Sequence, residues 1–118
     1  MNKRALGSDQ ESLAAKYLEE QGMQIVERNY RNKHGEIDLI GYHKGYLVFI
    51  EVKYRSGTVA GSAAESVDWR KQRKICRVAD YYRYTHGIGD NIGVRYDVVA
   101  IQREEINWIP NAFLHVYR

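Results

Sequence analysis

The feature that most constrains the fold is the apolar run YLVFI, residues 46–50, which leads into Glu51 and, two residues later, Lys53. Side chains alternate between the two faces of a strand, so consecutive apolar residues require cover on both faces. A strand with one face in water shows an alternating pattern instead. The run therefore predicts the central strand of a covered sheet, with two charges at its end.

The rest of the 118-residue chain supplies the elements that such a sheet needs. The patterns predict a first helix that begins at Ser8 and ends near Gly22, and a second helix over residues 65–84. Strands are predicted at residues 24–30, 36–42, 46–54, 94–102 and 106–110, with Pro110 ending the last one. The expected fold is one α/β domain over residues 1–118, with a mixed central sheet flanked by helices, in the order helix, three strands, helix, then one or two strands.

Cellular location is indicated by what the sequence lacks. The longest apolar run is far too short to span a bilayer, and the first residues show no apolar stretch of signal-peptide length. The single cysteine, Cys76, excludes an intramolecular disulfide. We expect a cytoplasmic protein with no membrane partner.

The turn between two predicted strands brings acidic residues together. If residues 44–45 form a two-residue hairpin turn, Asp38 lies opposite Glu51, and Glu36 lies opposite Lys53. Salt bridges between the strands, with Glu36 bound to Lys53, are one explanation. A divalent cation between Asp38 and Glu51 is the other, because like charges placed opposite each other destabilise a hairpin unless something compensates them. Oxygen ligands suit Mg²⁺ or Mn²⁺.

Three stretches carry a resemblance to a known family. They are ESLAAKYLEEQGMQIVERNYR at residues 11–31, GEIDLI at 35–40 and VFIEVKYR at 48–55. Together they resemble the YraN-like family of small bacterial proteins, placed in the PD-(D/E)XK superfamily of restriction-endonuclease-like and Holliday junction resolvase-like nucleases. The resemblance covers most of the chain and implies a restriction-endonuclease-like core.

The resemblance also implies site residues and a reaction. Asp38 and Glu51 would be metal ligands, with the carbonyl of Val52 as a third, and Lys53 would lie near the attacking water. The cofactor would be Mg²⁺ or Mn²⁺, and hydrolysis would leave a 3′-hydroxyl and a 5′-phosphate. Physical chemistry agrees, because a metal ion lowers the pKa of bound water and neutralises charge that develops on phosphate.

Two further residues have both a site interpretation and a structural one. Glu11 is similar to a helix-one acid that joins the metal site in resolvase-like members, yet it also completes a capping box with Ser8. Gln72 shares the face of Ile75 and Ala79, and some members of the superfamily send a helix-two glutamine or lysine into the site. A buried amide bonded to backbone is the alternative for Gln72.

Basic residues surround the acidic motif in the sequence, although the net charge is only +3. A solvated charged face would explain the helical run alone, whereas cations around a metal site favour a phosphate-binding rim and DNA as the partner. The rim is predicted to comprise Arg31, Lys33, Arg55, Arg70, Arg73, Lys74 and Arg77. Residues 55–64 are predicted to form a mobile surface loop that is able to move over a site. Asp97 is predicted to pair with Arg95 or with cations of the second helix.

The expected function is metal-dependent endonucleolytic hydrolysis of DNA, with branched or structured DNA among the substrates. The alternative is a nucleic-acid-binding module that has the same fold and little or no turnover. A third reading is a structural relic in which Glu36, Glu51 and Lys53 form salt bridges.

Overall fold

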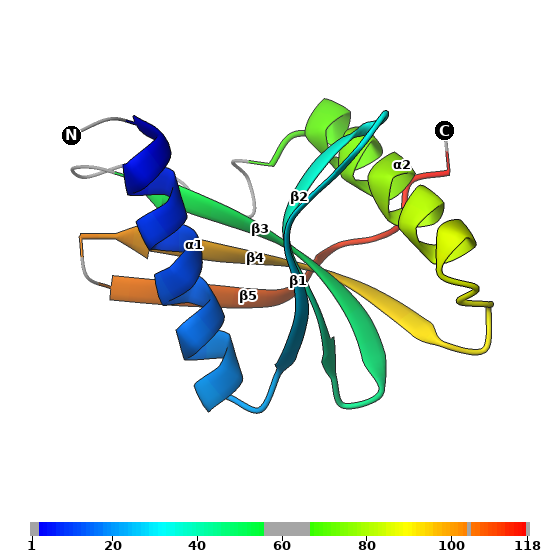
Figure 1. Ribbon diagram of the computed structural model, residues 1–118, viewed down its shortest axis with the longest axis horizontal. Coiled ribbons are helices and arrows are strands. Elements are labelled where there is room, and N and C mark those ends of the chain that lie inside the picture. The colour runs from blue at the N-terminus through cyan, green and yellow to red at the C-terminus, as the bar shows by residue number, and fades with distance from the viewer. Residues whose placement is uncertain (1–2, 56–66, 104, 118) are drawn as a thin grey trace.

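A computed structural model describes residues 3–55, 67–103 and 105–117. Two helices and five strands follow one another along the chain (Figure 1). They are α1 (Lys3–Glu20), β1 (Gln24–Asn32), β2 (Gly35–His43), β3 (Tyr46–Arg55), α2 (Trp69–Thr85), β4 (Gly93–Gln102) and β5 (Glu105–Phe113). The predicted order is confirmed, with the predicted loop 55–64 lying, apart from Arg55, outside the described residues.

The strands form one mixed sheet in the order β1-β2-β3-β4-β5. β3 and β4 run parallel, with α2 in the connection between them, and the other neighbouring strands run antiparallel. A parallel pair needs a crossover connection, usually through a helix, which explains why α2 stands between β3 and β4 in the sequence. The α/β class with a mixed sheet is therefore confirmed, and β3 is the central strand.

Each helix covers a different face of the sheet, as the apolar run of β3 requires. On one face, Ala14, Ala15 and Leu18 of α1 pack with Val48 and Ile50. On the other face, α2 packs against Leu47 and Phe49. In Figure 1, α1 crosses in front of the sheet and α2 lies to the right.

The start of α1 differs from the prediction. The helix begins at Lys3, so Ser8 lies in its interior and the predicted capping box with Glu11 is wrong. The end is as predicted: Gly22 has a φ of 97°, and the Met23 N–H donates to the Leu18 carbonyl at 3.0 Å. Glycine tolerates this left-handed conformation, which closes the helix.

The second helix begins four residues later than the predicted start, at Trp69. Asp68 is its N-cap and accepts a hydrogen bond from the Lys71 N–H at 2.9 Å. The predicted buried face is confirmed, since Ile75, Val78, Ala79 and Tyr82 are all buried. Residues 65–66 lie outside the described residues.

Pro110 does not end the last strand, because β5 continues to Phe113. β5 is an edge strand, where proline's missing N–H leaves no neighbour unpaired. The β4–β5 register shifts between Tyr96 and Val98, and the buried carboxylate of Asp97 accepts from the Asn111 N–H there at 2.9 Å. The predicted Arg95–Asp97 pair is confirmed, with two contacts of 2.9 Å.

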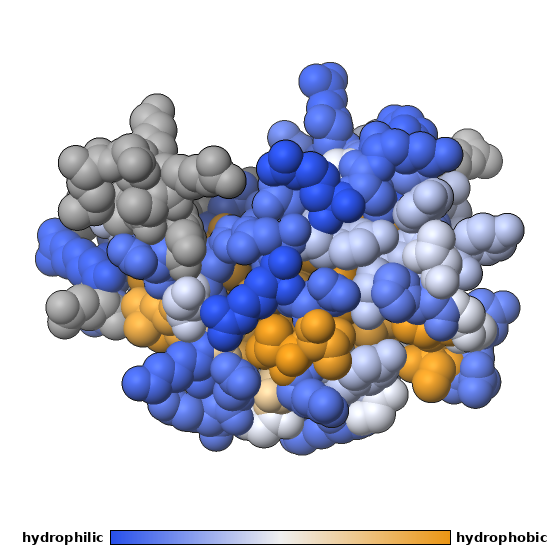
Figure 2. Space-filling model, in the orientation of Figure 1, coloured by the Kyte–Doolittle hydropathy of each residue, from blue (hydrophilic) through white to orange (hydrophobic). Residues whose placement is uncertain are grey.

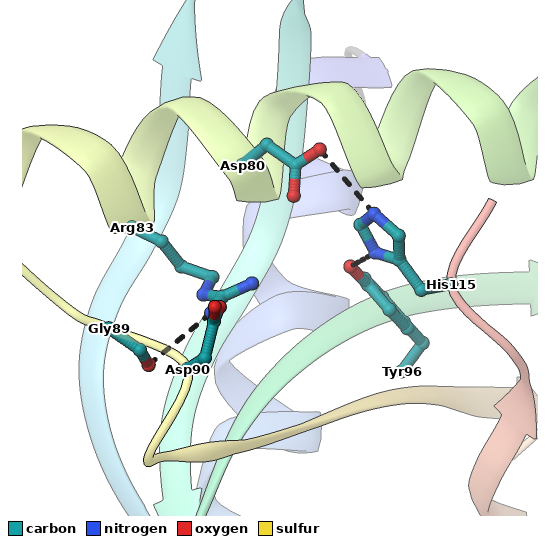
Figure 3. A network of polar contacts seen from close by, with 6 residues as sticks. All are labelled: Asp80, Arg83, Gly89, Asp90, Tyr96 and His115. Carbon is teal, nitrogen blue, oxygen red and sulfur yellow. Dashed lines mark hydrogen bonds and ion pairs between the residues drawn. The ribbon is translucent and has the colours of Figure 1, made fainter. Parts of the chain in front are cut away.

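The last residues tie α2 to β4 (Figure 3). His115 lies between the two elements, with Nδ1 2.5 Å from the Tyr96 hydroxyl and Nε2 3.4 Å from an oxygen of Asp80. The next residue, Val116, donates its N–H to the Cys76 sulfur at 3.3 Å. Cys76 is a buried free thiol that packs in the α2-side core.

Among the described residues, no helix is long and apolar enough to cross a membrane.

Candidate carboxylate and lysine site

The β2–β3 hairpin turns at Lys44 and Gly45, as predicted. His43 pairs with Tyr46, and the ladder continues to the pair Leu39 and Ile50. Lys44 and Gly45 have φ values of 51° and 83°, which suit a two-residue turn with both central residues in the left-handed region. The register prediction is therefore confirmed for this part of the hairpin.

The ladder ends at the pair Leu39 and Ile50, so neither the predicted pair Asp38 and Glu51 nor the predicted pair Glu36 and Lys53 forms part of it. Glu36 faces Arg31 across the β1–β2 ladder, and an Arg31 nitrogen lies 3.1 Å from its carboxylate. Lys53 instead contacts Glu51. The salt bridge expected between Glu36 and Lys53 does not form.

The regular alternation of side chains along β2 is interrupted at Asp38. Leu39 packs in the α1-side core, whereas Ile37, two residues earlier, packs in the α2-side core. In a regular strand these two side chains would share a face. Asn29, on the neighbouring strand β1, has a φ of 51° between the paired residues Arg28 and Tyr30. Asparagine tolerates this conformation better than most residues, so the irregularity is built into the sequence.

Asp38 lies where β2 and β3 stop pairing. Its Oδ2 accepts a hydrogen bond from the Val52 N–H at 2.8 Å, so the side chain takes a backbone donor of β3. Burial raises the pKa of Asp38 to about 6, and the negative charge and hydrogen bonding of Glu11 add to the rise, while the Val52 bond opposes it. An acid in this state is poised between its neutral and charged forms near neutral pH.

Glu51 is 7 % exposed and contacts two lysines. Its Oε1 lies 3.6 Å from Nζ of Lys53 and 3.5 Å from Nζ of Lys71, on α2. Burial, and next the charge of Asp38, raise the pKa of Glu51 to about 7, although both lysines act in the opposite direction. Two cations therefore do not fully compensate the cost of burying this carboxylate beside Asp38.

Glu11 brings α1 into the same site. Burial raises the pKa of Glu11, while side-chain hydrogen bonds to Asp38 and Asn29 lower it, and the charges of Glu36 and Glu51 add to the rise. The capping box, which was the structural interpretation of Glu11, does not form. The contacts of Glu11 with Asp38 and Asn29 support the site interpretation instead. Side chains from both helices thus meet where β2 leaves β3.

The donor chemistry of this cluster fits a hard divalent cation. Glu11, Asp38 and Glu51 offer carboxylate oxygens, and the raised pKa values of all three show negative charge that their neighbours do not compensate. In the described ranges, no three acidic, histidine or cysteine side chains converge closely enough to form a ready-made metal site.

The Gln72 side chain hydrogen bonds to the backbone just before the start of α2. Its Nε2 donates to the Val67 carbonyl at 2.9 Å, which is the structural alternative considered for this residue. A role in the reaction stays a prediction.

The predicted rim residues are distributed over β1, its turn and α2. Arg31, Lys33, Arg70, Lys74 and Arg77 are exposed, Arg73 is partly exposed, and the Arg55 side chain lies outside the described part of the chain. Arg31 is engaged with Glu36, and Arg73 lies over the ring of Trp69. Exposure leaves the rim available to a polyanion.

Sequence reasoning missed two residues of the cluster, Lys71 and Asn29. Lys71 stands in the basic run of α2, and a solvated helix face is the ordinary explanation of such a run. Its position three residues after the N-cap Asp68 places it in the first turn, beside the end of β3. Asn29 has no signal in the periodicity of β1, because its role depends on a local change of backbone conformation.

The fold and the cluster define the chain as an α/β protein with a mixed five-stranded sheet and a carboxylate and lysine site beside its central strand. The model of uncharacterised protein family UPF0102 matches residues 10–101. The chain belongs to this family.

Curated relatives cover nearly the whole chain. A UPF0102 protein of Lachnoclostridium phytofermentans is 46% identical over 113 residues, which is 96% of each chain. A UPF0102 protein of Aliivibrio salmonicida is 44% identical over 116 residues, 96% of this chain and 94% of the relative. One of Shewanella oneidensis is 44% identical over 108 residues, 92% of this chain and 98% of the relative.

Proposed function

We propose that this chain is a cytoplasmic, Mg²⁺- or Mn²⁺-dependent nuclease of the PD-(D/E)XK type that hydrolyses phosphodiester bonds of DNA, including branched DNA. The observation that carries the proposal is the meeting of Asp38 and Glu51, both with raised pKa values, beside Lys53 at the end of β3. Strongly perturbed acids with a specific cationic partner are typical of catalytic sites. The restriction-endonuclease-like assignment of the core belongs to the same proposal.

Asp38 and Glu51 would hold the metal ion, with Glu11 and the Val52 carbonyl as further ligands. When bound, the ion would supply a more acidic water and neutralise charge on the phosphate. The chain itself orients Asp38: the Val52 N–H holds one of its oxygens, and a side-chain hydrogen bond joins it to Glu11. Burial keeps bulk water away from Glu51 and strengthens its interactions with cations.

Lys53 has a second task in this proposal. Its ammonium, 3.6 Å from Glu51, would orient the attacking water and stabilise negative charge on the phosphate oxygens as the bond to the 3′ oxygen breaks. The leaving 3′ oxygen takes up a proton, and the products are a 3′-hydroxyl and a 5′-phosphate. Lys71 would hold Glu51 in its charged form.

A second candidate function is favoured by the two lysines on Glu51. Lys53 and Lys71 together supply cationic partners in place of a metal ion. In that case the chain would be a nucleic-acid-binding module with this fold and little or no turnover, and its rim would carry the function.

A substrate panel with and without metal separates the two candidates. Labelled single-stranded, duplex, flap and four-way DNA would be incubated with Mg²⁺ or Mn²⁺, using the wild type, Asp38→Asn and Glu51→Gln. Glu36→Gln is the matched control, because Glu36 is an acid on the same strand as Asp38 that pairs with exposed Arg31.

The nuclease proposal expects cleavage by the wild type and the control, and a loss of about a hundredfold or more in both site variants. Cleavage that survives in Asp38→Asn and Glu51→Gln would show that the assigned site is wrong. Binding to the panel without cleavage under any metal would favour the binding module.

A further inference from the structure

The outer face of α2 carries a row of two aromatic residues and two arginines. Trp69, Arg73, Arg77 and Tyr81 follow one another at intervals of four residues. This spacing places them along one face of a helix, which we call the α2 stripe. The buried residues of α2, such as Ile75 and Val78, lie on the opposite face. The stripe therefore faces away from the core.

Each aromatic ring of the α2 stripe is paired with a cation. The Arg73 guanidinium carbon lies 5.1 Å from the centre of the Trp69 ring, and Lys33 Nζ lies 5.4 Å from the centre of the Tyr81 ring. His34 meets the edge of Tyr81, with ring centres 5.7 Å apart. Lys33 and His34 form the β1–β2 turn, so this turn extends the stripe beyond the helix.

Exposure of the Trp69 ring is not explained by packing or by solubility. Trp69 is 56 % exposed. A solvated basic face would account for Arg73 and Arg77, but not for a large aromatic ring exposed to water on the same face. The acid Asp80 on this helix contacts His115, so the charge along the stripe is predominantly positive. Figure 2 shows hydrophilic residues mixed with paler ones over the upper right of the molecule, where α2 lies.

The α2 stripe begins beside the carboxylate cluster. Lys71, in the first turn of α2, reaches Glu51 at 3.5 Å. From Trp69 to Tyr81 the helix rises about 18 Å, at about 1.5 Å per residue. A single strand of nucleic acid spans this length with a few nucleotides, since backbone charges follow one another at roughly 3.4 Å or more.

We propose that the α2 stripe binds an unpaired nucleic-acid strand, with bases stacked on Trp69 and Tyr81 and phosphates held by Arg73 and Arg77. Rings and cations in this arrangement are the features that bind single strands without sequence preference. A duplex offers its phosphates but keeps its bases stacked inside, away from the rings. The inference rests on the proposed function in one respect: it makes the substrate of that site a DNA with an unpaired segment next to the bond to be cleaved.

Binding can be measured without turnover. The test uses a labelled thymidine strand of about 10 nucleotides and a duplex of the same length, in chelator, with fluorescence anisotropy. Trp69→Leu and Tyr81→Leu are each expected to weaken single-strand binding about tenfold or more, and to leave duplex binding unchanged. Trp69→Phe, which keeps a ring, should retain most of the affinity. Base stacking should also quench the fluorescence of Trp69 and spare that of Trp108.

Tyr46→Leu is the matched control. Tyr46 is 46 % exposed and has Arg95 5.8 Å from its ring centre, but it lies at the opposite end of β3 from Glu51 and Lys53. This variant should bind both nucleic acids like the wild type. Equal losses on single strand and duplex in Trp69→Leu, or no loss at all, would overturn the inference.

Failure of the proposed function gives a different result. If the chain has no nuclease activity, cleavage is absent on every substrate while the single-strand effect of Trp69→Leu in chelator persists. If only the stripe is misassigned, cleavage depends on Asp38 while Trp69→Leu and Tyr81→Leu bind and cleave like the wild type.

Discussion

Asp38 accepts the Val52 N–H at 2.8 Å across the point where β2 and β3 separate. Without this bond, a backbone donor of the central strand would lose its partner beside a buried acid. The side chain therefore both closes the end of the ladder and holds one carboxylate oxygen in place. The same contact links fold and site, because it fixes Asp38 relative to Glu51, one residue before Val52.

Replacing Asp38 with asparagine separates these two tasks. The amide oxygen of Asp38→Asn can still accept from Val52, so we expect the free energy of unfolding to fall by no more than about 1 kcal/mol. Loss of a residue that only supports a metal ligand lowers metal affinity by roughly 10–100-fold. Because Asp38 would be a ligand itself, the affinity for Mg²⁺ or Mn²⁺ should fall by more than this. Isothermal titration calorimetry measures the affinity, and chemical denaturation measures the stability.

The control for this prediction is Glu36→Gln, which removes an acid of β2 that pairs with Arg31 and acts on the cluster only through its charge. It should change the metal affinity far less than Asp38→Asn does. Unchanged metal affinity in Asp38→Asn would remove this residue from the ligand set.

Stability should depend on pH through Glu51 and Asp38. Folding raises the pKa of Glu51 from 4.5 to about 7 and that of Asp38 from 3.8 to about 6. The folded state thus holds these protons more tightly than the unfolded chain does. The stabilising effect of protonation is therefore complete below the unfolded pKa values, 4.5 for Glu51 and 3.8 for Asp38. This stabilisation is lost as the pH rises from the unfolded to the folded pKa of each group, by about 1.4 kcal/mol per pH unit for one fully titrating group.

Chemical denaturation in chelator at a series of pH values measures this dependence. In Glu51→Gln the fall in stability between the unfolded pKa of 4.5 and about 7 should be smaller than in the wild type. Added Mg²⁺ should restore stability on the alkaline side, because metal binds the charged carboxylates. A pH profile identical in wild type and Glu51→Gln would contradict the assignment.

Much of the fold follows from local sequence signals. The apolar run of β3 predicts a covered central strand, and Ala14, Ala15 and Leu18 of α1 supply cover on one side. The short turn at Lys44–Gly45 fixes the hairpin register, because a two-residue loop allows few pairings. These signals depend on neighbours in the chain, which is why they can be read without a structure.

The errors lie where distant contacts decide. The capping pattern at Ser8 is overridden because α1 extends to Lys3. Pro110 does not end β5, since the strand lies at the edge of the sheet. The pairing of β2 with β3 ends at Leu39 and Ile50, because the Asp38 side chain accepts from the Val52 N–H and β2 changes face there. No periodicity in the sequence carries that information.

The C-terminal contact of His115 should stabilise the fold without affecting the site. Tyr96 is only 2 % exposed, and His115→Ala removes one partner of its hydroxyl as well as the contact with Asp80. Loss of a partner for a buried polar group costs about 1–3 kcal/mol, which denaturation would detect. Leu114→Ala, at a residue that is 78 % exposed, should be neutral. Equal stability of His115→Ala and the wild type would show that this contact contributes nothing.

Lys71 should set the pH range in which Glu51 is charged. Its Nζ lies 3.5 Å from Glu51 and lowers the pKa of that carboxyl. In Lys71→Met the apolar stem remains and the charge is lost, so we expect the acidic limb of the metal-affinity profile to move up by about one pH unit or more. Calorimetric titrations across the pH range measure the limb. Lys74→Met is the matched control, because it removes an exposed lysine of the same helix and should leave the limb in place. An equal shift in both variants would mean that Lys71 acts through the overall charge of α2 rather than through its contact with Glu51.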